Sequence, residues 1–238
     1  MLGDDENSAS LPSSFNEFSS TQAALFEGAS SLGDAVGLLE SGDTIKQLTE
    51  AWMNERNAPE LLTYKGYLVN ELVEALDFQV NRILETPMTT HQDKLNSMLY
   101  QNEIERIKFI IKSYLRTRLH KIEKCTLDLL RHQESEQLMS DKELIYARKY
   151  QQLVEQHHYD SFLNTLPEKQ HKQDEKTGEL DMVVKSNLEA PVFIKVLDWS
   201  GNVELAKDEM VLFEKDDIFI LRYGDVRSLL LDGNIRLL

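Results

Sequence analysis

The clearest pattern in the chain is a helical repeat of apolar residues between residues 104 and 124. The stretch contains no Gly or Pro, and as a single helix it would be about 32 Å long. Phe109 and Ile110 widen the apolar side, which predicts contact with more than one neighbour. The apolar residues that recur at spacings of three and four are Ile104, Ile107, Ile111, Tyr114, Leu115, Leu119 and Ile122. Basic residues lie between them: Arg106, Lys108, Lys112, Arg116, Arg118, Lys121 and Lys124.

The same periodicity predicts further helices on both sides of this stretch. Asp43 or Ser41 can cap a helix that begins near Thr44. Ser140 and Glu143 have the spacing of a capping box. An up-and-down four-helix bundle is the simplest packing of these segments. The predicted helices cover 44–56, 65–84, 93–131 and 140–163, so the central helix extends beyond the opening pattern.

Beyond residue 190 the pattern changes to short β-branched and aromatic runs. Gly201-Asn202 is a hairpin signal and predicts a tight turn. Asp225 can cap a short helix that ends at Asp232-Gly233. The predicted strands cover 192–197, 209–213, 217–222 and 235–238. The fold class is therefore α+β and mainly α: a tail (1–40), a helical domain (41–165), a linker (166–190) and a small β-rich domain (191–238).

Charge is distributed unevenly along the 238 residues, whose net charge is −15. Residues 1–43 hold eight acidic residues and no Lys or Arg. A chain this acidic is repelled by bulk DNA, so strong direct DNA binding is not expected. No apolar run is long enough to span a membrane, and no signal peptide is recognisable at the N-terminus. Cys125 is the only cysteine, which favours a reducing compartment.

The acidic tail contains one short apolar segment with two interpretations. Leu32, Val36, Leu38 and Leu39 lie close together in an otherwise polar stretch, and most of them could share one face of a short helix. This segment is either a docking peptide that folds on a partner or a solvated tail with chance apolar residues.

No catalytic or cofactor motif is recognisable. The chain has no phosphate-binding glycine loop, no nucleophile elbow and no zinc-type Cys/His spacing. Cys125 falls on an apolar helix side and is expected to be a buried structural thiol. The adjacent residues His157 and His158 diverge on a helix and cannot readily share a metal ion. The sequence therefore predicts no enzyme, no cofactor and no metal.

The basic residues of 104–124 have three interpretations. Their stems can flank the apolar stripe while their heads stay in water. The stretch can form a helical nucleic-acid-binding module, although it lacks a separate basic face. Arg106, Arg116 and Arg118 can instead pair with carboxylates of neighbouring helices or subunits, since arginine suits partly buried, bidentate pairs. We favour the third interpretation for the arginines.

Two ordered motifs resemble a known family. The first is Trp52-Met-Asn-Glu-Arg-Asn-Ala-Pro-Glu-Leu-Leu62, and the second is the whole of residues 103–124. They resemble the W-x-N-E-x-x-[AS]-P-E-L-L and E-x-E-R…S-Y-[LI]-R-x-R-L-x-K-I blocks of the Sld-five-type subunit of the GINS complex. Residues 138–148, 221–230 and 235–238 are similar to later parts of that family, so the resemblance covers about 44–238.

The resemblance implies a fold with a helical A domain and a small β-rich B domain. It implies a nuclear, non-enzymatic subunit of a heterotetramer with three sister GINS subunits. This assembly joins the MCM ring and its DHH-family partner to form the replicative helicase, and connects it to polymerase epsilon. In some members the N-terminal tail binds a trimeric replisome adaptor.

The resemblance also implies positions that form subunit interfaces or a fold signature. Trp52, Leu61 and Leu62 would anchor the first helix against the bundle. Arg106, Tyr114, Arg116, Arg118 and Lys121 would lie where subunits pack. The remaining signature positions are Asn54, Glu55, Pro59, Glu60, Leu119, Ile122, Arg222, Tyr223, Leu237 and Leu238.

Overall fold

The computed structural model describes residues 35–85, 90–131, 137–167, 170–177, 180–197, 201–204 and 210–238. The chain divides into two units, 1–42 and 43–238. In the first unit only the opening turns of one helix, from residue 35, are described. Leu32 lies outside the described residues, and the backbone of Val36, Leu38 and Leu39 is helical.

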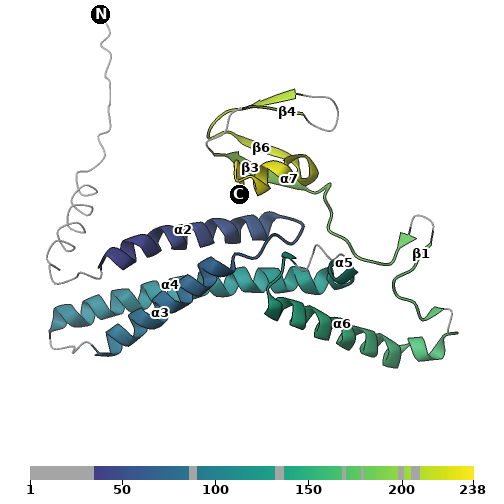
Figure 1. The fold of residues 1–238 in the computed structure, drawn as a ribbon, viewed down its shortest axis with the longest axis horizontal. Helices are drawn as coiled ribbons and strands as arrows, with labels where there is room; N and C mark the ends of the chain where they lie inside the picture. Colours follow the sequence, from purple (N-terminus) through teal and green to yellow (C-terminus); the bar gives the residue numbers. More distant parts are fainter. Residues whose placement is uncertain are drawn as a thin grey trace, which may run out of the picture. The chain divides into compact units, whose positions relative to one another are not determined.

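The second unit is mostly helical, with a small antiparallel sheet near the C-terminus (Figure 1). This confirms the predicted fold class. The helices are α2 (Ala35–Asn57), α3 (Gly66–Glu85), α4 (His91–Lys124), α5 (Thr126–Arg131), α6 (Asp141–Ser161), the 3-10 turn η2 (Leu163–Thr165) and α7 (Tyr223–Leu231).

The boundaries of two helices differ from the prediction. Helix α2 begins at Ala35 rather than near Thr44, since the glycines before Thr44 weaken a helix without stopping it. Helix α4 begins after Thr90, which forms a capping box with Asp93. It ends at Lys124 because the backbone of Cys125 leaves the helical region, so the predicted helix over 93–131 is two helices, α4 and α5. The capping box of Ser140 and Glu143 at α6 is confirmed.

Two apolar clusters hold the helices together. The first joins α2, α3 and α4 around Leu48, Leu72, Ile111 and Tyr114. Half-buried Trp52 packs against this cluster, as predicted, and meets the ring edge of exposed Phe109. The second cluster surrounds Leu61, Ile122, Cys125, Met139 and Ala147, near α5 and α6. Ile110 and Cys125 are buried, as the apolar pattern predicts.

The C-terminal part contains a three-stranded antiparallel sheet of order β6-β3-β7. The alternating burial of β3 turns Val192, Ile194 and Val196 toward the core, where Phe213 and Tyr223 are fully buried. A second sheet pairs β4 with β5. The strands are β3 (Pro191–Val196), β4 (Gly201–Glu204), β5 (Met210–Phe213), β6 (Ile218–Arg222) and β7 (Ile235–Leu237).

Three predictions for this part need correction. Gly201 and Asn202 belong to β4, because β3 pairs with β6 and β7 rather than with the next strand. Asp225 lies in the first turn of α7, and Arg222 is the residue before that helix. The predicted linker contains a short antiparallel pair, β1 (Lys176–Thr177) and β2 (Leu180–Asp181). The predicted end of α7 is confirmed, since Gly233 has a positive φ of 77°.

Candidate functional site

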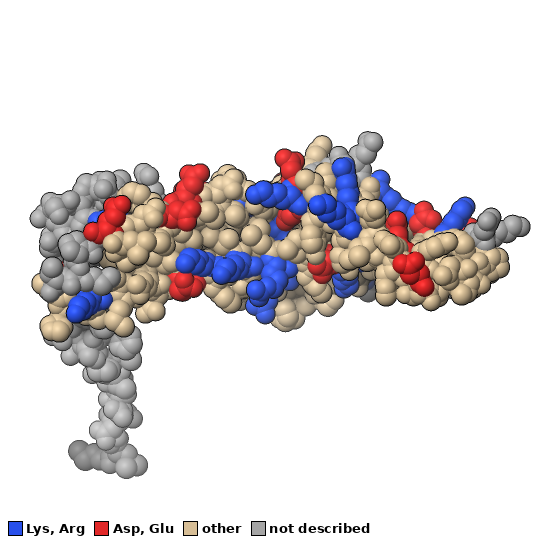
Figure 2. All heavy atoms as spheres, turned by 90° about the horizontal axis from the view of Figure 1, so that it is seen from below, with Lys and Arg blue, Asp and Glu red and all other residues tan. Residues whose placement is uncertain are grey.

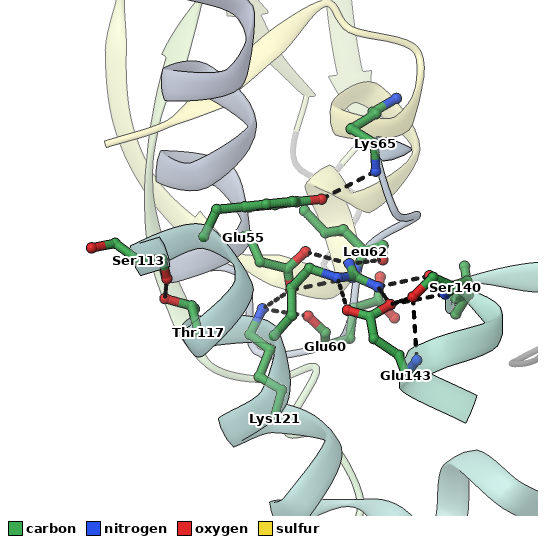
Figure 3. A network of polar contacts seen from close by, with 12 residues as sticks. Glu55, Glu60, Leu62, Lys65, Ser113, Thr117, Lys121, Ser140 and Glu143 are labelled. Carbon is green, nitrogen blue, oxygen red and sulfur yellow. Dashed lines mark hydrogen bonds and ion pairs between the residues drawn. The ribbon is translucent and has the colours of Figure 1, made fainter. Parts of the chain in front are cut away.

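Arg118 of α4 is the centre of a buried polar network. Figure 3 shows a network of polar contacts in which Glu55, Leu62, Lys121 and Glu143 are labelled. Its side chain has no exposed surface. Nε and Nη2 donate to the two carboxylate oxygens of Glu143, at 2.8 and 3.2 Å. Nη1 donates to Glu55 at 3.0 Å and to the carbonyl of Leu62 at 2.6 Å. Nη2 also donates to the carbonyl of Leu138 at 2.8 Å, so all three guanidinium nitrogens are paired.

Two tyrosine rings complete the surroundings of Arg118. Its guanidinium carbon lies 5.2 Å from the ring centre of Tyr64 and 5.8 Å from that of Tyr114. Cations attract the faces of aromatic rings at such distances. The hydroxyl of Tyr114 accepts a hydrogen bond from the backbone N–H of Lys65 at 3.2 Å, and burial raises the pKa of Tyr114. The rings therefore add both packing and a further link between segments.

Lys121 balances the charge of the network. Its ammonium group donates to Glu55 at 2.8 Å and to the carbonyl of Glu60 at 2.7 Å. Burial lowers the pKa of Lys121, while Glu55 opposes this shift. Burial also disfavours the charge of Arg118, but the hydrogen bond that it donates to Glu143 and the charges of Glu55 and Glu143 outweigh this effect and raise the pKa of Arg118. Two cations thus face two carboxylates, which limits the cost of burying them.

The local sequence explains why these groups meet. Tyr114, Arg118 and Lys121 are spaced by four and three residues, so they lie on one side of α4. Helix α2 ends at Asn57, and the chain continues without regular structure until α3 begins at Gly66. This connection carries the carbonyl of Leu62 to Arg118, next to Glu55 from the last turn of α2. Residues from separate parts of the chain are therefore tied to one arginine.

The end of α2 and the connection that follows it contact the C-terminal domain. The side-chain oxygen of Asn54 accepts a hydrogen bond from the backbone N–H of Leu237 at 2.8 Å. Glu60 accepts from the hydroxyl of Tyr223 at 2.7 Å and from Arg227 at 2.6 Å. Ala58 belongs to the C-terminal core cluster, and Leu62 packs against it. Residues 54–62 therefore link the helical domain to the C-terminal domain.

The structure distinguishes among the arginines that the sequence grouped together. Arg118 pairs with Glu55 and Glu143 of neighbouring helices, as the third interpretation expects for this residue. Arg106 instead pairs with Glu103 of its own helix, and both side chains are about half exposed. Arg116 is exposed and has no ion-pair partner within the described ranges.

The other predicted positions are divided between core and surface. Leu61, Ile122, Tyr223 and Leu237 are buried. Leu119 and Pro59 are half-buried, and Leu62 packs against the C-terminal core. Arg222 forms an exposed ion pair with Glu189, and Leu238 is 38% exposed.

Three participants in the network were not predicted. Glu143 was assigned only to the helix cap, and it also binds Arg118. Tyr64 lies two residues after the end of the first motif, and this proximity was the available signal in the sequence. Arg227 gives no sequence signal for its contact with Glu60, since the two lie 167 positions apart.

The described residues show no arrangement typical of a reactive site. Among the described residues, no three His, Cys, Asp or Glu side chains are grouped so that they could hold a metal ion. None of the described helices is both long and apolar enough to cross a membrane. The polar groups of the Arg118 network are paired with one another, so the network can hold segments together. The Arg118 network therefore has a structural role: it holds the segments of the helical domain together.

Comparison with known proteins agrees with this architecture. Residues 76–162 match the family described as "GINS complex protein helical bundle domain", and residues 187–238 match "DNA replication complex GINS protein SLD5 C-terminus". The class is thus a GINS protein with a helical bundle and a C-terminal domain.

Relatives in distant eukaryotes identify the family within this class. The chain is 32% identical to the Schizosaccharomyces pombe DNA replication complex GINS protein sld5 over 81% of its length and 91% of the relative's. It is 32% identical to the Bos taurus protein (84% and 92%) and to the Arabidopsis thaliana protein (84% and 93%). The chain belongs to the Sld5 family of GINS proteins.

Proposed function

We propose that this chain is a non-catalytic structural subunit that binds three sister subunits to form the GINS heterotetramer. In this proposal the assembly acts in the nucleus with the MCM ring and its DHH-family partner, as part of the replicative helicase, and connects it to polymerase epsilon. Family membership supports a role in the GINS complex. The MCM ring, its DHH-family partner and polymerase epsilon are proposed as partners because the family resemblance implies them.

The observation that carries the proposal is the contrast between the buried Arg118 network, whose charged groups pair within the chain, and large apolar side chains that remain exposed. The family motifs supply Arg118, Glu55 and Lys121, which bind one another inside the chain. Large apolar side chains of α3 and α4 remain exposed: Tyr67 (62%), Phe78 (59%), Leu84 (78%), Leu95 (53%) and Leu99 (59%). Exposed apolar side chains, where they lie together, are typical of surfaces that bind other proteins.

Co-expression with the three sister subunits from the same genome tests the proposal. We expect one species with 1:1:1:1 stoichiometry in size-exclusion chromatography. Elution of the chain apart from the sisters would contradict the proposal.

The pairing of basic residues argues against a nucleic-acid-binding module at 104–124. Arg118 and Lys121 are occupied within the network, and Arg106 and Lys108 pair with glutamates of their own helix. Of the seven basic residues in 104–124, only Lys112, Arg116 and Lys124 form no ion pair with another described residue. A salt-dependent shift of duplex DNA by the full chain would support that alternative.

We also propose that the segment containing Leu32, Val36, Leu38 and Leu39 docks on a trimeric replisome adaptor. The apolar residues within an acidic tail support this proposal. A synthetic peptide covering 28–44 should bind the adaptor, and absence of binding would remove the proposal.

A further inference from the structure

We propose that a cavity beside the end of α4 binds a small organic acid through its carboxylate and its short apolar body. The cavity, called here the lysine cavity, has a volume of about 250 Å³. One water molecule needs about 10–15 Å³ of such space, so the cavity has room for a small organic molecule. The inference does not depend on the proposed assembly role.

Three parts of the chain line the lysine cavity. Pro59 and Leu61 come from the connection between α2 and α3. The end of α4 and part of α5 form a second side, and the segment that precedes β3 forms a third. These segments are far apart in the sequence, so tertiary packing creates the space and no local motif marks it.

One part of the lining is apolar. Leu61, Cys125 and Leu129 are only 5%, 6% and 9% exposed and belong to the second apolar cluster of the helical domain, so the cavity reaches this buried layer. Pro59 and Ala190 are half-buried and extend the apolar part. A hydrocarbon body that contacts such a surface leaves water, which is favourable.

The rest of the lining is basic and polar, and no acidic residue belongs to it. Lys121 pairs with Glu55 at 2.8 Å, and Lys185 pairs with Asp181 at 2.7 Å. Lys124 is exposed and forms no ion pair with another described residue. Figure 2 shows Lys and Arg side chains gathered over part of one face, although the net charge of the chain is −15. A local basic site can therefore exist within this acidic chain.

The charge of the lining favours a ligand with a single negative charge. The charge of Asp128 also acts on Lys185, so Lys124 supplies the cation that no described carboxylate offsets. A phosphate monoester carries about two negative charges at neutral pH, more than one free ammonium group offsets. A carboxylate carries one, and burying it costs least where a cation and hydrogen-bond donors receive it.

Two further donors line the same cavity. The hydroxyl of Ser186 and the side-chain amide nitrogen of Asn187 donate to no other described residue. Each can donate a hydrogen bond to a carboxylate oxygen. Together with the ammonium group of Lys124, they provide donors for both oxygens of the acid, while its hydrocarbon part lies against the apolar lining.

Cys125 provides a built-in reporter, because it lines the cavity and is the only cysteine of the chain. The full chain is treated with iodoacetate or, separately, with iodoacetamide, and alkylation is followed by the mass of the intact chain. In both reactions the thiolate sulfur bonds to the methylene carbon, iodide leaves and the thiol proton passes to the buffer. The reagents are similar in size and differ in charge, so the ratio of their rates measures the preference of the cavity for a carboxylate.

The charge of Lys124 is reversed in Lys124→Glu. The matched control is Lys149→Glu, an exposed position of α6 that does not line the cavity. We expect the ratio of the iodoacetate rate to the iodoacetamide rate to fall about fivefold in Lys124→Glu and to stay at the wild-type value in the control. Any change in the thiolate fraction cancels in this ratio. If Lys124→Glu lowers the thermal transition, Lys124→Gln replaces it, with an expected fall of about twofold.

Protection by a model acid tests the whole ligand class. Hexanoate at millimolar concentration should slow the alkylation of wild-type Cys125 by iodoacetamide about threefold or more. Hexanamide and inorganic phosphate, at the same ionic strength, should have little effect, and hexanoate should lose its effect in Lys124→Glu.

Several results would overturn the proposal. Absence of protection by hexanoate, or an unchanged rate ratio in the Lys124 variants, would show that the cavity does not select a carboxylate. Equal protection by hexanamide would remove the role of charge, and equal protection by phosphate would remove the role of the apolar body. A thiol that reacts with neither reagent would show that the cavity does not admit small molecules. These measurements need no sister subunit, so none of these results bears on the assembly role.

Discussion

Arg116 and Arg118 are two residues apart on α4, and they have opposite environments. Arg118 is enclosed by Glu55, Glu143 and two carbonyls and has no exposed surface. Arg116 is exposed and has no ion-pair partner in the described part of the chain. A separation of two residues turns side chains about 200° apart on a helix. The same residue type thus maintains the fold on one side and is available to a partner on the other.

The largest effect that would separate the two arginines is on stability. Replacing Arg118 with Met leaves Glu143 buried without its cation and leaves Glu55 with Lys121 alone, and should lower the free energy of unfolding by about 3–5 kcal/mol. Replacing Arg116 with Met should change it by less than about 0.5 kcal/mol. Urea denaturation of the full chain measures both values. If both variants lost a similar free energy of unfolding, Arg116 and Arg118 would not differ in their structural roles.

Leu237 and Leu238 extend the comparison to the C-terminus. Leu237 is 1% exposed, whereas Leu238 is 38% exposed. Leu237→Ala should cost about 2–5 kcal/mol because it leaves a cavity in the C-terminal core, and Leu238→Ala should cost much less. Removal of both residues should disrupt this domain and weaken assembly. An unchanged thermal transition after that truncation would contradict the placement of Leu237 in the core of the C-terminal domain.

The contact between the domains should have an intermediate effect. Tyr223→Phe removes the hydrogen bond to Glu60 while Arg227 keeps its own. We expect a loss of about 1–2 kcal/mol in the free energy of unfolding, since the buried carboxylate oxygen loses one partner. The matched control is Tyr146→Phe, which removes a hydrogen bond to Glu123 at an exposed position. Equal losses in both variants would argue against a structural role for the Glu60 contact.

The smallest expected effect is a pH dependence above neutrality. Burial and the hydrogen bond to Glu60 raise the pKa of Tyr223 above its ordinary value of 10.0. The stabilisation is therefore complete below about pH 10 and is lost as pH rises, because the unfolded chain ionises first. Between about pH 9 and pH 11, the Tm of the wild type should fall more steeply than that of Tyr223→Phe. Parallel pH profiles would mean that the phenol is not held neutral by folding.

Local signals predicted much of the fold, and contacts between distant segments were not predictable. The Ser140–Glu143 capping box and the repeat in 104–124 depend on residues within a few positions of each other. The partner of Arg118 in α2 is 63 positions away, so no helical spacing reveals it. Cys125 interrupts the central helix without Gly or Pro, and the sequence carries no stop signal there.

The family resemblance located the signature positions without separating their roles. It grouped Arg106, Arg116 and Arg118 because all three belong to one motif. Their partners differ because each points in a different direction from α4, and direction depends on where α2, α3 and α6 pack. That packing is decided by tertiary contacts, which the motif does not contain.

A double-mutant cycle between Arg118 and Glu143 tests the central claim most directly, because it isolates the pair from other effects of substitution. The measured quantity is the free energy of unfolding of the wild type, Arg118→Met, Glu143→Gln and the double variant. We predict that the double variant is no less stable than Arg118→Met, with a coupling of about 2 kcal/mol or more. Additive losses within about 0.5 kcal/mol would contradict the account, because they would show that the two side chains do not interact in the folded protein.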